Sequence, residues 1–177
     1  MSYDETLPSS EFAFEFLKKM KVPYHVRRHS LKVTDKALEI AEKITKIDLD
    51  VNLIEIGALL HDVGRAKTHG FKHAIIGAQI LREHGFSEKL ARICETHILG
   101  GLDKIDAVSV NLPEREFLPQ SIEEKIICLA DKHMAGTREV SIEQRFNNWF
   151  VKYGKTQILI KAKKRIEDIQ AELKKLM

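Results

Sequence analysis

Residues 51–64 read VNLIEIGALLHDVG, an apolar run that closes with two adjacent metal-competent side chains, His61 and Asp62. Asp50 can cap this run as the start of a helix. Such a helix has almost no polar face, which is typical of a helix at the centre of an all-helical domain. A carboxylate at its buried end is costly unless a cation lies beside it. The stretch therefore predicts a central buried helix that leads into a charged site.

Apolar residues recur at helical spacing on both sides of this stretch, and no alternating run is long enough to predict a sheet. Ser121 with Glu124 forms a capping box that opens one of these helices. Together with the central helix we expect about seven to eight helices, the others near residues 10–20, 23–44, 72–84, 87–97, 121–132, 141–151 and 155–176. The prediction is an all-α protein with one compact domain, divided into an N-terminal helix (1–22), a core (23–136) and C-terminal helices (137–177).

The composition supports a helical, globular chain. Gly and Pro together make 13 of the 177 residues, well below the usual ~12%, which excludes collagen-like, low-complexity and turn-rich all-β proteins. Two cysteines, Cys94 and Cys128, are too few for a disulfide scaffold or a Cys-rich zinc module, and both stand in apolar runs. Eight histidines remain unexplained by composition.

The positive charge of the chain is concentrated at its C-terminal end. Residues 152–177 hold eight Lys or Arg and three Asp or Glu, a charge of +5, so the other 151 residues carry −2 of the net +3. We expect the basic run 161–165 to be the solvated face of the last helix and, failing that, a nucleic-acid contact. The polar segment 1–10 and the lack of a long apolar run predict a cytoplasmic protein without a membrane segment.

Residues 98–120 interrupt the helical pattern. They include Gly100, Gly101, Pro113 and Pro119 and show no sustained periodicity. A connection of this length within a compact domain is usually a functional loop or an error in assigning the elements, and we favour the loop. We therefore expect a long loop that serves as a lid or substrate wall, with a short extended piece at 108–110.

Metal-competent side chains stand where helical periodicity calls for hydrophobic ones. A single histidine on an apolar face is usually a hydrogen-bonded core residue, and the pair His61–Asp62 alone is weak evidence because short motifs recur by chance. The same coincidence nevertheless recurs at His29, His97 and Asp131. Mixed histidine and carboxylate ligands suit Mn, Fe, Co, Ni or Zn better than Mg. The pattern predicts a transition-metal site.

Five sequence pieces carry a resemblance to a known family. They are RHSLKV (28–33), LLHDVGR (59–65), HAIIGA (73–78), ETH (95–97) and LADK (129–132). In this order they resemble the HD superfamily of metal-dependent phosphohydrolases in its HDIG-like form, over about residues 24–136. The arrangement is also similar to small bacterial HD hydrolases that cleave diadenosine tetraphosphate. Val63 and Arg65 stand where that signature usually has Ile and Lys.

The resemblance implies the fold, the activity and the residues of the site. It implies an HD-type helical domain that hydrolyses a nucleotide, a dinucleoside polyphosphate or another small phosphate ester by metal-activated water. One metal would be held by His29, His61, Asp62 and Asp131, and a second by Asp62, His73 and His97. Asp62, His73 and His97 are the expected catalytic residues, with His73 or His97 as general acid if the second ion is absent.

Basic side chains beside these motifs could hold substrate phosphates. The candidates are Arg28, Arg65, Lys67, Lys72 and Lys132, with Arg65 and Lys132 best placed. Two alternative functions remain open for this chain. One is a non-catalytic module that senses a nucleotide or docks RNA, and the other is a di-iron oxygenase. The sequence leaves the oligomeric state open, a homodimer included.

Weaker motifs point elsewhere. Residues 154–156, Gly-Lys-Thr, look like the end of a P-loop, but Trp149 stands where its first glycine belongs. His69 and His73 lie four apart without the glutamate of a helical metalloprotease. We expect the remaining histidines at the surface or around the ligands, and these are His25, His69, His84 and His133.

Overall fold

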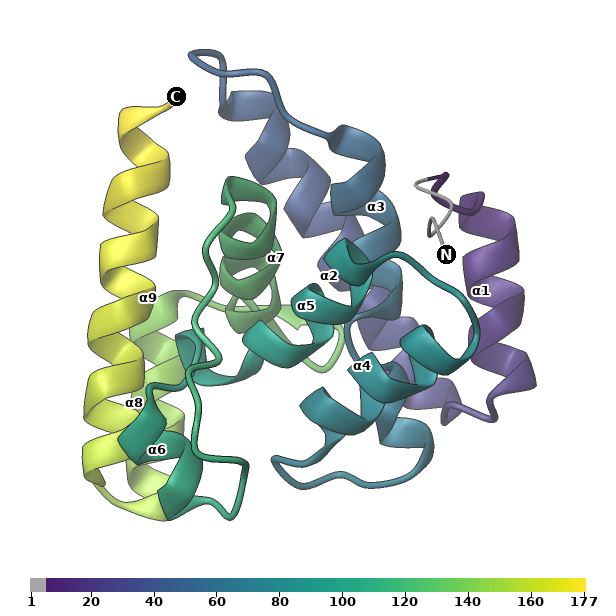
Figure 1. Cartoon of the computed structure of the whole chain (residues 1–177). Coiled ribbons are helices and arrows are strands. Elements are labelled where there is room, and N and C mark those ends of the chain that lie inside the picture. Colours follow the sequence, from purple (N-terminus) through teal and green to yellow (C-terminus); the bar gives the residue numbers. More distant parts are fainter. Residues whose placement is uncertain (1–5) are drawn as a thin grey trace.

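The computed structural model describes residues 6–177, so the first five residues of the predicted N-terminal segment lie outside the described part. Within that part the chain is all-α, as predicted, apart from one hairpin of two short strands with two residues each (Figure 1). The helices are α1 (Ser10–Lys19), α2 (Tyr24–Lys43), α3 (Val51–Leu60), α4 (His73–Glu83), α5 (Glu88–Thr96), α6 (Lys104–Ser109), α7 (Ile122–Lys132), α8 (Ile142–Tyr153) and α9 (Gln157–Lys175). Two 3-10 helices, η1 (Val63–Ala66) and η2 (Ile98–Gly100), and two strands, β1 (Met134–Ala135) and β2 (Arg138–Glu139), complete the fold.

Helix α3 lies at the centre, as its apolar sequence predicts. It packs against α1, α2, α5 and α7, and seven of its ten residues are buried. Asp50 caps it, because its Oδ1 accepts a hydrogen bond from the backbone nitrogen of Leu53 at 2.9 Å. At Gly57 a Cβ atom would lie only 2.5 Å from Ile93 Cδ1 and 2.9 Å from Ile127 Cδ1. This close packing fixes α3 against α5 and α7.

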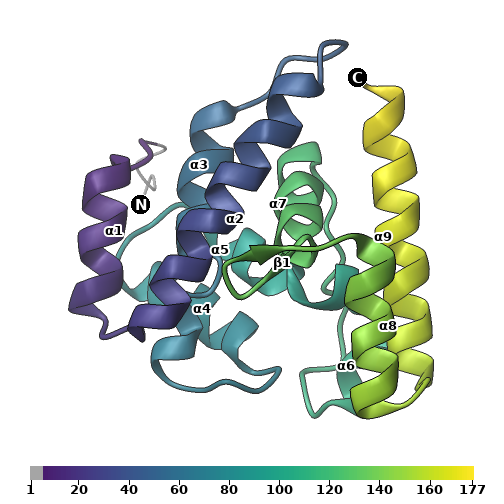
Figure 2. The ribbon, with the colours of Figure 1, turned by 180° about the vertical axis from the view of Figure 1, so that it is seen from behind.

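The two ends of the described chain lie on opposite sides of the molecule. Figures 1 and 2 show α1 on one side and α9 on the other, with α2, α3 and α7 between them. Helix α9 packs against α7 and α8 through a stripe of buried residues that includes Ala162, Ile166 and Leu173. The C-terminal helices therefore pack on the side of the core helices opposite to α1 (Figure 1).

The segment 98–120 is more ordered than the expected long loop, and the extended piece expected at 108–110 is wrong. Val108 belongs to α6, and the β-bridge of this segment joins Leu102 to Phe117. Asp103 and Asp106 form a capping box at the start of α6. The helix was missed because six residues are too few to display a periodicity, and its support comes from distant basic residues of α9.

The hairpin between α7 and α8 brings the backbone back to α2. Met134 pairs with Glu139 and Ala135 with Arg138, and Gly136 occupies the turn with φ +62°. A positive φ costs glycine little. The carbonyl oxygen of Gly136 reaches His29 of α2, so this turn contributes to the site described below.

The capping box predicted for α7 forms only in part. Ser121 caps the helix, because its hydroxyl accepts from the backbone nitrogen of Glu124. The Glu124 carboxylate instead accepts from the backbone nitrogen of Gln120 at 2.9 Å and pairs with Arg92. Among residues 6–177 no helix is both long and apolar enough to cross a membrane.

Candidate metal centre

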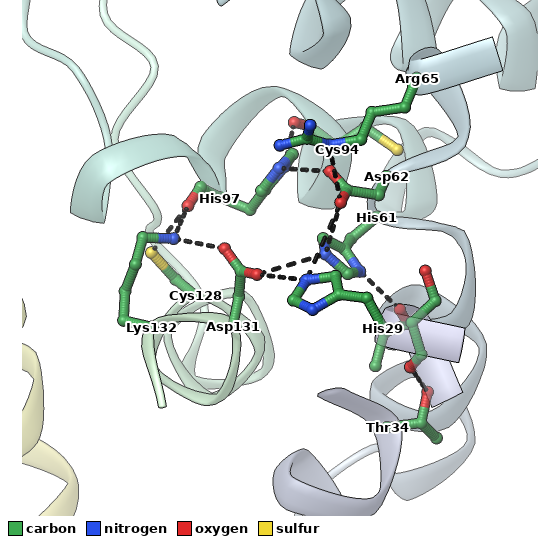
Figure 3. A network of polar contacts seen from close by, with 12 residues as sticks. His29, Thr34, His61, Asp62, Arg65, Cys94, His97, Cys128, Asp131 and Lys132 are labelled. Carbon is green, nitrogen blue, oxygen red and sulfur yellow. Dashed lines mark hydrogen bonds and ion pairs between the residues drawn. The ribbon is translucent and has the colours of Figure 1, made fainter. Parts of the chain in front are cut away.

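The six predicted metal ligands, which span residues 29 to 131, come together at one place. His29 projects from α2, His61 and Asp62 follow α3, His73 begins α4, His97 follows α5 and Asp131 lies near the end of α7. Figure 3 shows His29 and His61 pointing toward both Asp62 and Asp131. The ligand atoms group into three overlapping sets, within each of which all atoms lie within 4.8 Å of one another. Helix packing therefore converts five separated motifs into one cluster.

The four histidines share one hydrogen-bonding pattern. Each donates from Nδ1 to a backbone carbonyl oxygen: His29 to Gly136 at 2.7 Å, His61 to Ala58 at 2.6 Å, His73 to Gly70 at 2.8 Å and His97 to Cys94 at 2.7 Å. A carbonyl oxygen can only accept, so Nδ1 carries the proton in each ring. In the neutral ring this leaves the lone pair on Nε2, which is the state that binds a metal.

Asp62 lies between two pairs of histidines. Its Oδ1 is 3.0 Å from His73 Nε2 and 3.3 Å from His97 Nε2. Its Oδ2 is 3.6 Å from His61 Nε2 and 3.9 Å from His29 Nε2. The two oxygens thus face different halves of the cluster, so this carboxylate could serve as a ligand on both sides.

Asp131 lies closest to two histidines of the cluster. Its Oδ1 is 2.9 Å from His29 Nε2 and 3.6 Å from His61 Nε2. The shortest contacts form one group of His29, His61, Asp62 and Asp131 and another of Asp62, His73 and His97, and a third group of His61, His97 and Asp131 connects them.

Several nitrogen and oxygen atoms of the cluster lack a favourable partner within the protein. His73 Nε2 and His97 Nε2 are 3.1 Å apart, and two lone pairs facing at this distance repel unless a cation lies beside them. Within residues 6–177, His61 Nε2 and Asp62 Oδ1 are buried and have no hydrogen-bond partner. Buried polar atoms are rarely left unsatisfied. A divalent transition metal would satisfy all of them.

The charges of the site are set by burial and by neighbouring groups. Burial opposes ionisation of both carboxylates, yet His61 and the other imidazoles hold the pKa of Asp62 well below its usual range. Lys132, with His29 and His61, does the same for the pKa of Asp131. Burial lowers the pKa of His97 to about 4, so this ring is neutral at pH 7. A neutral ring favours the ligand role of His97 over the general-acid role.

Lys132 supports the cluster instead of reaching toward a substrate. It is 2% exposed, and its Nζ donates to the His97 carbonyl oxygen at 2.7 Å and to Asp131 Oδ2 at 2.6 Å. These two bonds leave Asp131 Oδ1 directed at the histidines. The expectation that Lys132 contacts a phosphate missed this role, because no sequence pattern indicates that a lysine next to Asp131 is buried.

The other predicted phosphate-binding residues differ in position. Arg65 lies at the centre, with Nε 2.9 Å from Asp62 Oδ2, and Arg28 is exposed at the same cavity beside the Tyr24 ring. Lys72 is exposed at the start of α4 and, like Lys67, does not line the cavity. The structure therefore brings two of these five basic residues into the cavity with their charges facing it, and Lys132 into its wall.

A cavity of about 1020 Å³ opens onto the metal ligands. Aromatic side chains from three separate parts of the chain also line it, namely Tyr24, His25, His69, Phe71, Trp149 and Tyr153. Of the segment 98–120, only Ile98 and Leu99 line the cavity, so the expected lid or wall is supplied mainly by α8 and the start of α9.

Sequence reasoning missed the contribution of α8. Arg145, Trp149 and Tyr153 all line the cavity. Their spacing of four places them on one helical face, and this was the available signal. His25 and His69, expected at the surface or around the ligands, are both exposed, and their rings stack at the cavity with centroids 6.4 Å apart.

Two weaker motifs have structural roles. Thr156 caps α9 by accepting from the Leu159 backbone nitrogen, and Gly154 ends α8 with φ +80°, so residues 154–156 are a helix connection and no P-loop. Cys94 and Cys128, which stand in apolar runs of the sequence, are both buried, and burial raises the pKa of both thiols.

The basic run 161–165 is largely neutralised. Lys161 and Arg165 pair with Asp103 and Asp106 of the α6 region. The other two basic residues have partners one turn along α9, Lys163 with Glu167 and Lys164 with Asp168. Little uncompensated charge remains there for a nucleic acid.

Comparisons with known proteins agree with this arrangement. The chain is 42% identical over 139 residues to an uncharacterised protein of Methanocaldococcus jannaschii, MJ0778, with 77% of this chain and 82% of that protein covered. It is 34% identical over 143 residues to a tRNA (cytidine(56)-2'-O)-methyltransferase of Thermoplasma volcanium. That match covers 81% of this chain but 41% of the enzyme, so this chain spans less than half of that relative's length.

A solved structure shares the fold. The HD domain of the L. monocytogenes phosphodiesterase PgpH, in complex with cyclic-di-AMP, superposes with a TM-score of 0.55 at 20% identity, over 88% of this chain and 92% of that chain. The HD domain family itself matches residues 26–136, which include all six clustered histidines and aspartates. By that match, and by the ligand cluster that the matched segment builds, the chain belongs to the HD domain family.

Proposed function

We propose that this protein is a metal-dependent phosphohydrolase that acts on a nucleotide, a dinucleoside polyphosphate or another small phosphate ester. The observation that carries the proposal is the position of Asp62, whose two oxygens face separate sets of histidine nitrogens with free lone pairs. Two metals sharing one carboxylate are suited to an in-line phosphoryl transfer, which needs no protein nucleophile.

One or two ions of Mn, Fe, Co, Ni or Zn, held by the two ligand sets, would supply Lewis-acid stabilisation and a water of lowered pKa. The chain's own residues do the rest. Arg65 holds a positive charge at the edge of the centre, 2.9 Å from Asp62, where it can bind a phosphate oxygen. Lys132 fixes Asp131 through Oδ2. The Nδ1 bond of His97 to Cys94 keeps Nε2 deprotonated and directed at Asp62.

The cavity supports a substrate of nucleotide size. At about 1020 Å³ it is at the upper end of the ~300–1000 Å³ range of small-molecule sites, and aromatic side chains line it away from the metal ligands. The PgpH HD domain, which has the same fold, binds cyclic-di-AMP. A phosphate at the metal centre with a base against the aromatic walls fits these features.

Metal content and turnover test the proposal directly. The full chain is purified, its metals are measured, and it is assayed with Mn, Co, Ni or Fe against phosphomonoesters, nucleotides and dinucleoside polyphosphates. We expect phosphate release that requires a metal. A protein that binds no metal and releases no phosphate after metal addition would refute the proposal, and product formation that requires oxygen would indicate a di-iron oxygenase instead.

A second candidate function is an RNA-docking or nucleotide-sensing module. It is favoured by the similarity to tRNA methyltransferases, in which a comparable domain is part of a longer chain. The paired charges of residues 161–165 speak against docking through that run. Tight RNA or nucleotide binding without turnover, unchanged in Asp62→Ala, would establish the module in place of the enzyme.

Metal binding should strengthen as the pH rises from 6 to 8. Burial disfavours the charged ring of His29, but Asp131 and Asp62 outweigh it and raise the pKa of His29 above 6.5. The His29–Asp131 pair therefore stabilises the metal-free fold at pH below ~6.5, and this contribution is lost as the pH rises through the raised pKa. A metal must displace the same proton.

The thermal midpoint measures this linkage. At a metal concentration of ~100 Kd we expect the melting temperature at pH 8 to rise by about 5–10 °C, and less at pH 6. His29→Gln should reduce the rise and its pH dependence, whereas His84→Gln, an exposed histidine at the end of α4, should change neither. An equal rise at both pH values would contradict the role of His29.

A further inference from the structure

Arg145 of α8 is a cation in the cavity without an acidic partner. Its guanidinium lies over the Trp149 ring, 4.6 Å from the centroid, and its Nε is buried without a hydrogen-bond partner. No carboxylate among residues 6–177 forms an ion pair with it. The side chain is half-buried and lines the same cavity as the metal ligands.

This lack of a partner distinguishes Arg145 from the arginines that hold the fold together. Arg82, Arg92 and Arg165 each pair with a carboxylate at 3.0 Å or less. Burial lowers the pKa of Arg145, but a guanidinium stays charged at neutral pH. A desolvated charge without a counterion costs stability. The unpaired charge of Arg145 therefore lowers the stability of the fold, and a bound anion would offset this effect.

The position of Arg145 indicates which anion. Arg145 lines the same cavity as Asp131 and Arg65, where the reacting phosphate of the proposed function would bind. Arg65 already lies against Asp62 at that centre. Arg145 comes from another wall, and residues 142–153 lie outside the segment that matches the HD domain family. Arg65 and Arg145 therefore reach one cavity from different elements, an arrangement suited to a ligand with two phosphate groups.

We propose that Arg145 binds a non-reacting phosphate of the substrate and so restricts the enzyme to nucleotides that carry at least two phosphate groups. This rests on the proposed phosphohydrolase function. The planar guanidinium offers two parallel N–H groups to a phosphate, and the Trp149 ring holds its plane in place. The exposed rings of Tyr24 and Tyr153, which line the cavity, are available to the nucleoside.

Calorimetric titration of the full, Mn-loaded chain tests the proposal with defined probes. The probes are AMP, with one phosphate, and the α,β-methylene analogue of ADP, with two in a linear chain; cyclic-di-AMP provides two phosphates in a ring. Arg145→Gln should weaken binding of a two-phosphate probe by about ten- to a hundredfold and of AMP by less than twofold. If only one of the two-phosphate probes loses affinity, that probe shows whether Arg145 binds a phosphate of a linear or of a cyclic nucleotide.

Two controls keep the result interpretable. Arg138→Gln removes an exposed arginine of β2 that does not line the cavity, and binding should not change. Arg145→Gln should melt no lower than the unsubstituted chain, because an unpaired charge is removed. Arg145→Lys keeps the charge without the planar fork and should recover part of the affinity.

The outcomes separate this proposal from the phosphohydrolase proposal. Equal weakening for AMP and the two-phosphate probes, or none for any probe, would overturn the role of Arg145 even if phosphate esters are hydrolysed. Selective weakening in a chain that hydrolyses no phosphate ester would sustain the binding site and refute the enzyme.

Discussion

Asp62→Asn should leave the fold intact and lower metal-dependent turnover by about 1000-fold or more. The amide keeps the shape of the carboxylate but removes the charge shared by the two ligand sets. Asp62 is 3% exposed and has histidine nitrogens on both sides, so no other carboxylate can replace it. Metal analysis should show loss from both sets, and circular dichroism should show unchanged helix content.

Two comparison variants sharpen this test. Asp131→Asn removes a ligand from one set only, so we expect it to lose one ion and keep part of the second, if two are bound. Asp35→Asn makes the same chemical change on the exposed face of α2 and should behave like the unsubstituted chain. Full metal content in Asp62→Asn would show that Asp62 is not a ligand.

Gly64→Ala should destabilise the fold by about 3 kcal/mol or more and remove metal binding with it. A Cβ atom at residue 64 would lie 1.9 Å from the carbonyl oxygen of His73 and 2.7 Å from the backbone nitrogen of Gly77. Both are backbone atoms, so no side-chain rotation relieves the contact. Helix α4 must move away from η1, and it carries His73 out of the cluster.

Thermal melting with metal analysis measures both effects. We expect the melting temperature to fall by about 6–12 °C or more. Gly70→Ala is the matched control, because its Cβ would lie 4.0 Å from the nearest heavy atom, Thr68 Oγ1, in the same connection. If Gly64→Ala melts and binds metal like Gly70→Ala, the close approach of η1 and α4 is not needed for the site.

The sequence allowed the central helix and the ligand cluster to be predicted because both depend on strong, local signals. The apolar run of α3 has no face suited to water, so its burial followed from the residues alone. His29, His97 and Asp131 stood out because polar groups interrupt apolar faces. Their meeting at one point needed the order of the motifs, since spacing along the chain does not give distance in space.

What could not be predicted depends on contacts between distant segments. Helix α6 is held by ion pairs to Lys161 and Arg165, more than fifty residues away. Lys132 is buried because Asp131 and the His97 carbonyl both accept from it. The contribution of α8 to the cavity required knowing how the C-terminal helices pack against the core.

The hydrogen bonds that orient the four histidines all end on the main chain. In many metal sites a side-chain carboxylate or amide fills this position, and a single replacement there disorients the ligand. Here the acceptors are the carbonyl oxygens of Ala58, Gly70, Cys94 and Gly136, which every amino acid possesses. The orientation of each imidazole ring is thus set by the backbone conformation. A substitution at any of those four positions that packing and turn geometry allow should therefore leave the histidine rings in place.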